Sequence, residues 1–297
     1  MFLSTLRGTP PISWVPFIGI SEPAPVVAVL RLGGVIASGS RFRSGLNLST
    51  IAPLIERAFS MRRVSGVALV INSPGGSPAQ SALICDRIRS WAAEKKKPVF
   101  AFTEDVAASG GYWLACAADE IYANENSIVG SIGVIYGGFG FHEALEKLGV
   151  ERRLHTSGDK KSILDPFSPQ KESDIRRVKS LQKELHGNFK ALVRERRGDR
   201  LKAGPRTLFS GEFWTGAAAL DLGLIDGIGD VRSVMRKKFG DKVQLRLLTK
   251  RQTLLSTLRR GDFSAAPSLD VVGLGGDIAD GLITAAEERL LWNRYGL

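Results

Sequence analysis

Residues 67–76 have the sequence Val-Ala-Leu-Val-Ile-Asn-Ser-Pro-Gly-Gly, in which an apolar, β-branched run leads directly into a turn of small residues. Such a run, bounded by turn residues, is typical of a strand buried on both faces. Outward from it, further strands are predicted at 26–32, 98–103 and 120–123, and helices at 48–61, 78–94 and 109–117. This close alternation predicts an α/β fold with a mainly parallel sheet flanked by helices.

The chain of 297 residues is predicted to form one main domain between two less regular parts. Residues 1–24 are rich in Pro and Gly and are expected to form an irregular arm. The main domain is expected at 25–240, and residues 241–297 are expected to form an extension. Within the extension, 262–275 have the composition of a linker, and 278–295 are predicted to be an amphipathic helix that packs on the domain or on a partner subunit.

The net charge of +11 is concentrated in residues 171–206, which carry twelve basic and five acidic side chains within and after a long polar helix predicted at 170–197. This segment is either a solvated helical face or a surface that contacts anionic lipid or nucleic acid. No nucleic-acid motif is present, so a peripheral contact with anionic membrane is the better of the last two. No run reaches the roughly 20 apolar residues of a membrane span, and no signal peptide is predicted. A cytoplasmic or peripheral membrane location is therefore expected.

Ser109 lies between a predicted strand and a predicted helix, in the sequence Ala107-Ala-Ser-Gly-Gly111. This pattern resembles a nucleophile elbow, in which small neighbours allow a serine to occupy a sharp turn. The alternative interpretation is an ordinary N-cap serine. The pair Gly75-Gly76 is expected at the same sheet edge, where its N–H groups bind an oxyanion or where it simply forms a tight turn after Pro74.

A serine hydroxyl becomes a good nucleophile only when a base removes its proton. None of the three histidines, His142, His155 and His186, lies in a recognisable triad context, and His186 is expected to be solvated. Lysine replaces histidine where burial makes its amine neutral. Lys160 and Lys161 are both candidates by composition, although a lysine pair is also common as surface charge.

The two cysteines, Cys85 and Cys116, lie in apolar, helix-like stretches and outside any CxxC pair. We predict that both are buried thiols. Neither an HExxH motif nor a phosphate-binding loop is present, so the sequence implies no metal or organic cofactor.

Five short blocks occur in an order that resembles the S49 peptidases, the signal peptide peptidase A family in its short form. The resemblance extends over about residues 26–231 and implies the fold shared by Clp-type proteases and crotonases. The blocks are Ile71-Asn-Ser-Pro-Gly-Gly76, Ala108-Ser-Gly-Gly-Tyr-Trp113, Gly130-Ser-Ile-Gly-Val134, Ser157-Gly-Asp-Lys-Lys-Ser162 with Asp165-Pro-Phe167, and Trp214-Thr-Gly216 with Gly223-Leu-Ile-Asp-Gly227.

The resemblance assigns roles that the residues alone leave open. Ser109 matches the nucleophile of the family. Lys161 matches the base, because the family pattern is Gly, two variable residues, Lys, Ser. Lys160 then occupies a variable position that is often aromatic, which is a mild departure. Ser131 matches a serine whose hydroxyl holds the base lysine.

The resemblance also implies an oxyanion hole formed by Gly76 and the N–H of Gly110. Relatives of this kind assemble as homo-oligomeric rings in which nucleophile and base meet across a subunit boundary. Ser109 and Lys161 are 52 residues apart. We therefore predict that they are not within hydrogen-bond distance, about 3.5 Å, in a single chain. Many family members carry an N-terminal membrane anchor, which is not predicted here.

Together these features predict a serine endopeptidase with a Ser-Lys dyad that cleaves short apolar or unfolded peptides, such as remnant signal peptides or membrane-protein fragments. One alternative is a crotonase-like enzyme acting on acyl-CoA, which would use the same glycine-based oxyanion hole without Ser109 or Lys161. The other alternative is a non-catalytic assembly protein of the same fold.

Overall fold

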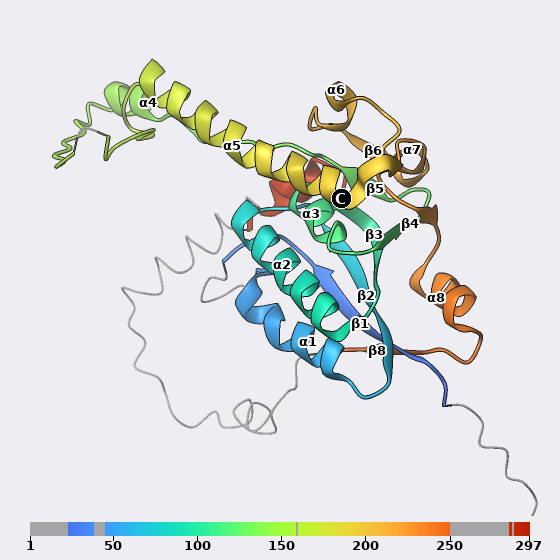
Figure 1. The fold of residues 1–297 in the computed structure, drawn as a ribbon. Coiled ribbons are helices and arrows are strands. Elements are labelled where there is room, and N and C mark those ends of the chain that lie inside the picture. Colours follow the sequence, from blue (N-terminus) through green and yellow to red (C-terminus); the bar gives the residue numbers. More distant parts are fainter. Residues whose placement is uncertain (1–22, 39–44, 159, 250–284, 287) are drawn as a thin grey trace, which may run out of the picture.

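The fold is built around one sheet that is flanked by helices (Figure 1). This computed structural model describes residues 23–38, 45–158, 160–249, 285–286 and 288–297. Among these residues the sheet has eight strands in the order β6-β5-β3-β2-β1-β8, and β4 and β7 branch from β3. All pairings are parallel except β5–β6. The strands are β1 (Val26–Gly33), β2 (Val64–Ser73), β3 (Val99–Ala108), β4 (Glu120–Ala123), β5 (Ile128–Gly130), β6 (Phe213–Thr215), β7 (Gly227–Ile228) and β8 (Gln244–Leu247).

Strand β3 is longer than the predicted strand 98–103. The polar pair Glu104-Asp105 ends the apolar run, but the strand continues past it to Ala108. The pairing of β2 with β3 shifts register at this point, because β3 has extra residues there. After the bulge, Val106 to Ala108 pair with β5. The bulge therefore carries the end of β3 to the residue before Ser109.

Helices cover both faces of the sheet. One face packs against α1 (Leu48–Ser60), α2 (Pro78–Lys95), α3 (Gly110–Ala115) and the end of α5 (Glu172–Arg197), and the other packs against α8 (Val231–Phe239). This mainly parallel sheet between helices confirms the predicted fold class. The remaining helices are α4 (His142–Lys147), α6 (Pro205–Leu208), α7 (Gly216–Asp221) and the 3-10 turn η1 (Gly198–Arg200).

Helix α5 packs on the core only through its C-terminal part. Its buried residues are Phe189, Val193 and Arg197, and the first half projects away from the sheet, with α4 at its far end (Figure 1). With a rise of 1.5 Å per residue, 26 residues span roughly 40 Å. The predicted exposed polar helix is therefore present, and it forms an arm that extends well beyond the domain.

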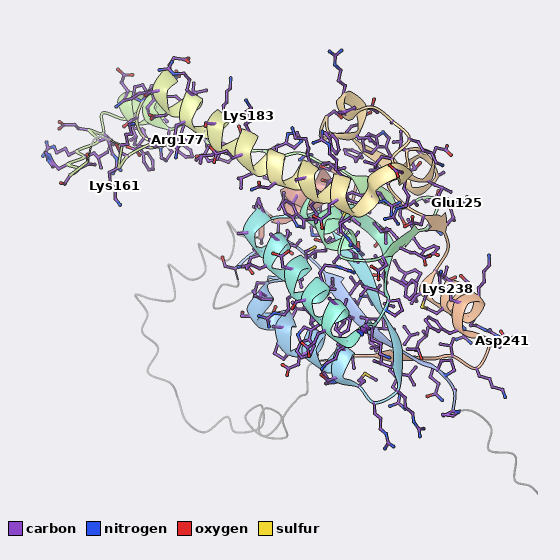
Figure 2. All side chains as sticks on the ribbon, viewed as in Figure 1. Glu125, Lys161, Arg177, Lys183, Lys238 and Asp241 are labelled. Carbon is purple, nitrogen blue, oxygen red and sulfur yellow. The ribbon has the colours of Figure 1, made fainter. Side chains whose placement is uncertain are left out.

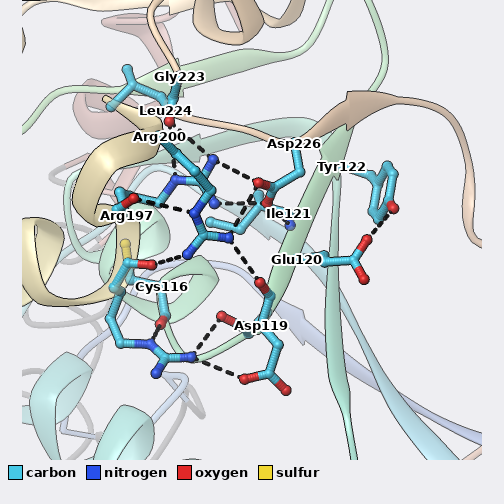
Figure 3. A network of polar contacts seen from close by, with 12 residues as sticks. Cys116, Asp119, Glu120, Ile121, Tyr122, Arg197, Arg200, Gly223, Leu224 and Asp226 are labelled. Carbon is cyan, nitrogen blue, oxygen red and sulfur yellow. Dashed lines mark hydrogen bonds and ion pairs between the residues drawn. The ribbon is translucent and has the colours of Figure 1, made fainter. Parts of the chain in front are cut away.

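A network of ion pairs fixes the C-terminal end of α5 to the domain (Figure 3). The Arg197 guanidinium, with 2% of its side chain exposed, donates to both Asp226 carboxylate oxygens and to the Gly223 carbonyl. Burial alone would raise the pKa of Asp226, but hydrogen bonds from Arg197 and from the N–H of Ile121 hold it below its usual range. Arg200 also donates to Asp226. Part of the basic surplus in 171–206 thus forms internal ion pairs, and does not belong to a solvated face or a lipid surface.

Both cysteines are free and buried, as predicted. Burial raises the pKa of the Cys116 thiol to about 12, and it raises that of Cys85 as well, so both thiols stay protonated. They fill space in the core beneath α2 and α3.

The last described segment, residues 288–297, lies against the sheet. It is helical at 288–293 and packs through Trp292 and Tyr295. The predicted helix at 278–295 therefore packs on the domain in the part that is described. The linker predicted at 262–275 lies outside the described residues, as does nearly all of the arm predicted at 1–24. Among the described helices, none has the length and apolar character needed to cross a membrane.

Candidate active site

Ser109 occupies a sharp turn between β3 and α3. Its φ of 52° and ψ of −120° lie in a region where residues other than glycine are rare. Two backbone hydrogen bonds hold it there, from its own N–H to the Gly130 carbonyl (2.8 Å) and from the Trp113 N–H to its carbonyl (3.0 Å). Ser109 is the N-cap residue of α3 by position, but its side chain makes no capping hydrogen bond to the helix, so it is not an ordinary N-cap serine. The backbone geometry is that of a nucleophile elbow.

Small residues after Ser109 are required because α3 begins close to β2. A Cβ added to Gly111 would lie 2.4 Å from the Ser73 carbonyl oxygen, and one added to Gly110 would lie 2.5 Å from Ser81 Oγ. Any larger side chain at either position would therefore displace the helix start and the serine that precedes it.

The Gly75-Gly76 turn lies directly against Ser109, as predicted from the shared sheet edge. Its φ angles are 104° and 138°. A Cβ on Gly75 would lie 2.8 Å from both the Ser109 Cβ and the Gly110 nitrogen, and a Cβ on Gly110 would lie 3.3 Å from the Gly76 nitrogen. The Gly110 N–H is in the first turn of α3 and has no acceptor within the helix. Two backbone amides beside a serine hydroxyl form an arrangement that can bind an oxyanion.

We predict that Gly76→Ala disrupts this turn. Its Cβ would lie 2.1 Å from the Ile36 carbonyl oxygen at a backbone conformation that alanine rarely adopts. We expect a loss of about 2 kcal/mol of unfolding free energy, measured by urea denaturation. Gly187→Ala is the matched control, because the space around Gly187 is open within a helix. Equal stability of the two variants would contradict this account of the turn.

Ser131 lies beside Ser109 on the neighbouring strand. Ala108 pairs with Gly130, so the two serines directly follow paired positions of β3 and β5. Ser131 is 3% exposed, and its N–H donates to the Glu212 carbonyl at 2.7 Å. Its hydroxyl accepts a hydrogen bond from Tyr295 Oη at 3.3 Å. Among the residues that the structure describes, a tyrosine and not a lysine therefore contacts the Ser131 hydroxyl.

Lys161 lies at the far end of the arm, away from the sheet (Figure 2). It is exposed, and it lines a shallow recess with Ser157, Gly158 and Lys160. Ser109 precedes α3 in the body of the domain, so one chain does not bring the two side chains together (Figures 1 and 2). This separation is what we predicted for an isolated subunit.

His186 is half-buried, and the prediction that it is solvated is wrong. Its Nε2 is buried without a hydrogen-bond partner among the described residues. Burial, assisted by the nearby charge of Lys190, lowers the pKa of this imidazole. The spacing of His186 to Phe189 and Val193, three and seven residues, places it on the packed stripe of α5. That spacing was the pattern that could have predicted its burial.

Sequence reasoning missed two aromatic residues at the site. Phe213 and Tyr295 pack edge to face with ring centroids 5.1 Å apart, beside Ser131. Phe213 pairs with Gly130 across β5–β6. Both lie far along the chain from Ser131, and no local motif marks either of them.

A strained serine beside two backbone amides and a second buried hydroxyl defines a site suited to nucleophilic acyl transfer. The sequence model of "Peptidase family S49" matches residues 92–244, just over half of the chain. The chain belongs to peptidase family S49, a family of serine-type peptidases. The predicted resemblance is confirmed, and with it the fold class.

Individual relatives share much of this chain. It is 49% identical over 272 residues to a protein named Na(+)/H(+) antiporter NhaA from Brucella abortus (strain 2308), covering 91% of this chain and 37% of that protein. It is 29% identical over 268 residues to "Serine protease SPPA, chloroplastic" from Arabidopsis thaliana, covering 85% and 39%. The chain thus spans less than two fifths of either relative.

Among solved structures, the fold is similar to a mutant of the 1510-N membrane-bound stomatin-specific protease in complex with a substrate peptide. The TM-score is 0.49 and the sequence identity is 15%, with 80% of this chain and 99% of that chain covered.

Proposed function

We propose that this chain is a serine endopeptidase in which Ser109 is the nucleophile and Lys161 of a neighbouring copy is the general base. One observation carries the proposal: Ser109 is held at a positive φ, with no capping bond to its side chain, against the Gly75-Gly76 turn. An ordinary helix start needs no such backbone strain. Membership in family S49 supports the same chemistry.

The proposed reaction is acyl transfer in two steps. The Ser109 hydroxyl attacks the peptide carbonyl carbon while a neutral lysine amine takes its proton. The carbonyl oxygen becomes an oxyanion, which the N–H groups of Gly76 and Gly110 bind. The protonated lysine then gives its proton to the leaving amine, and water releases the acyl group by the same path. The Ser131 hydroxyl would orient the lysine amine.

The arm supports the proposal that the base comes from another copy. Ten of the sixteen exposed large hydrophobic residues in the described part of the chain lie between 135 and 185, including Phe139 and Leu148, each 75% exposed. Lys161 lies among them. A second copy packed on this surface would cover the apolar side chains and remove water from the amine, which favours its uncharged form. Repetition of one such heterologous contact closes a ring when the rotation between neighbouring copies is a whole fraction of a turn.

The proposed substrates are short, extended, apolar peptides, such as spent signal peptides or fragments of membrane proteins. The relative named serine protease SPPA supports peptide cleavage, and the apolar class of peptide is our own proposal. A ring would enclose the sites and exclude folded proteins. The antiporter name belongs to a relative that lies mostly outside the match, and it gives no support for transport here.

Labelling with a serine-directed fluorophosphonate tests the proposal against both alternatives. The probe is expected to form a covalent adduct on the peptide that contains Ser109, identified by mass spectrometry. Neither an acyl-CoA enzyme that does not use Ser109 nor a non-catalytic protein would react in this way.

Two variants complete the labelling test. Ser109→Ala should abolish labelling. Ser77→Ala should keep it, because Ser77 is a true N-cap whose side chain accepts from the Gln80 N–H. Absence of an adduct in correctly assembled protein, or an adduct on another residue, would overturn the assignment.

A further inference from the structure

Residues 288–297 place two aromatic side chains in an apolar recess on the sheet. Tyr295, 7% exposed, forms a buried cluster with Val106 and Ala108, and Trp292 packs against that cluster with Ile128. The segment is red in Figure 1 and packs on the ends of β3 and β5. The recess is made by the last residues of β3 and by β5, the two strands that end one residue before Ser109 and Ser131.

Tyr295 also makes a polar contact with the proposed machinery. Its Oη donates to Ser131 Oγ at 3.3 Å, across 164 residues of chain, and its ring packs edge to face on Phe213. Ser131 is 3% exposed in this arrangement. An incoming amine needs direct access to the hydroxyl oxygen, and the Tyr295 side chain occupies that approach.

Two occupants therefore compete for one hydroxyl. In the proposed reaction, the amine of Lys161 from a neighbouring copy must reach Ser131. In the structure, Tyr295 contacts the Ser131 hydroxyl, and Lys161 lies at the far end of the arm that α5 forms. A serine hydroxyl can make more than one hydrogen bond, so the exclusion is one of space. Ser131 is 3% exposed with Tyr295 in contact with its hydroxyl, and an amine can reach that hydroxyl only if a covering side chain moves away.

We propose that residues 288–297 are an autoinhibitory segment, bound through Trp292 and Tyr295 in the recess beside Ser131, which must leave before Lys161 of a neighbouring copy can be seated. This inference rests on the proposed function, because it needs Ser131 to hold the base. A segment docked in about nine molecules of ten lowers apparent activity about tenfold. Assembly and activation are thereby linked, since the arm of the neighbour and the segment compete for one site.

The test uses the full chain with Trp292→Ala and Tyr295→Ala together. We expect kcat/KM for an apolar fluorogenic peptide to rise about tenfold. Tyr295→Phe, which keeps the ring and loses only the hydroxyl, should raise it about threefold, as expected for loss of one hydrogen bond. Leu290→Ala is the matched control: Leu290 belongs to the same segment but is 61% exposed, so no change is expected.

A second measurement does not depend on catalysis. A fluorescein-labelled peptide of residues 288–297, added to the double variant, is expected to bind with a rise in anisotropy and to lower kcat/KM back toward the wild-type value. The same peptide with both aromatic residues replaced by alanine should do neither. Thermal melting of each variant establishes that it is folded.

The outcomes separate the inference from the function on which it rests. If Ser109→Ala abolishes cleavage but the double variant and Tyr295→Phe are both no faster than wild type, the segment does not inhibit and only this inference fails. The same conclusion follows if the peptide does not bind the folded double variant. If cleavage survives Ser109→Ala, the proposed function fails and this inference fails with it.

Discussion

Chains with Ser109→Ala and chains with Lys161→Ala are each expected to lose at least about a thousandfold in peptide cleavage, as other nucleophile and base variants do. Mixed in equal amounts and allowed to exchange subunits, the two inactive chains are expected to recover about a quarter of wild-type activity. Each site needs an intact serine from one copy and an intact lysine from its neighbour. Random assembly of a heterologous ring satisfies both conditions in about one site in four.

This recovery distinguishes a shared site from one completed within a chain. The structure holds Lys161 at the end of an arm whose other end is fixed to the core, so its own Ser109 is out of reach. Lys160→Ala is the matched control and should keep near wild-type activity, because only Lys161 matches the position of the base. Mixed assemblies would be isolated through two different affinity tags. If such assemblies form and stay inactive, the shared-site proposal is wrong.

The fold was predictable where local pattern and tertiary structure agree. The apolar run of β2 and the short strand β4 lie where the sequence placed them, because each is a β-branched or apolar run between turn residues. The end of β3 was not predicted. Glu104 and Asp105 interrupt the apolar pattern, and only the pairing of Val106 to Ala108 with β5 shows that the strand continues.

The candidate site likewise contains some residues that local pattern predicts and others that only tertiary packing brings together. Ser109 and the Gly75-Gly76 turn could be predicted from their small neighbours and their positions after strands. Tyr295 could not, because its contact with Ser131 joins residues 164 apart and depends on how the sheet and the segment 288–297 pack. The helical periodicity of that segment predicts an apolar face, but it contains no information about which part of the domain the face covers.

Arg197→Met is expected to lower the unfolding free energy by about 3–5 kcal/mol, the typical cost of removing one partner of a buried ion pair. The substitution removes hydrogen bonds to both Asp226 oxygens and to the Gly223 carbonyl. Asp226, whose side chain is 16% exposed, would keep Arg200 and the Ile121 N–H as its partners among the described residues. At roughly 3 °C per kcal/mol for a domain of this size, the melting temperature should fall by about 9–15 °C.

Arg177→Met is the matched control for this substitution. Arg177 lies on the projecting half of the same helix (Figure 2), so its replacement should change stability by less than about 0.5 kcal/mol. Urea denaturation of both variants at pH 7 measures the difference. A loss for Arg197→Met below about 1 kcal/mol would show that the pair contributes no more than a surface ion pair.

The effect of Arg197→Met should also depend on pH. Arg197 and the Ile121 N–H hold the pKa of Asp226 below its unfolded value, so the carboxylate stabilises the fold above about pH 4, and this contribution is lost as the pH falls through the lower, folded pKa. The variant lacks most of that contribution. The stability difference between wild type and Arg197→Met should therefore be largest near neutral pH and shrink in acid. A difference that stays constant from pH 7 to pH 3 would mean that packing of the Arg197 side chain, and not its charge, fixes the arm to the domain.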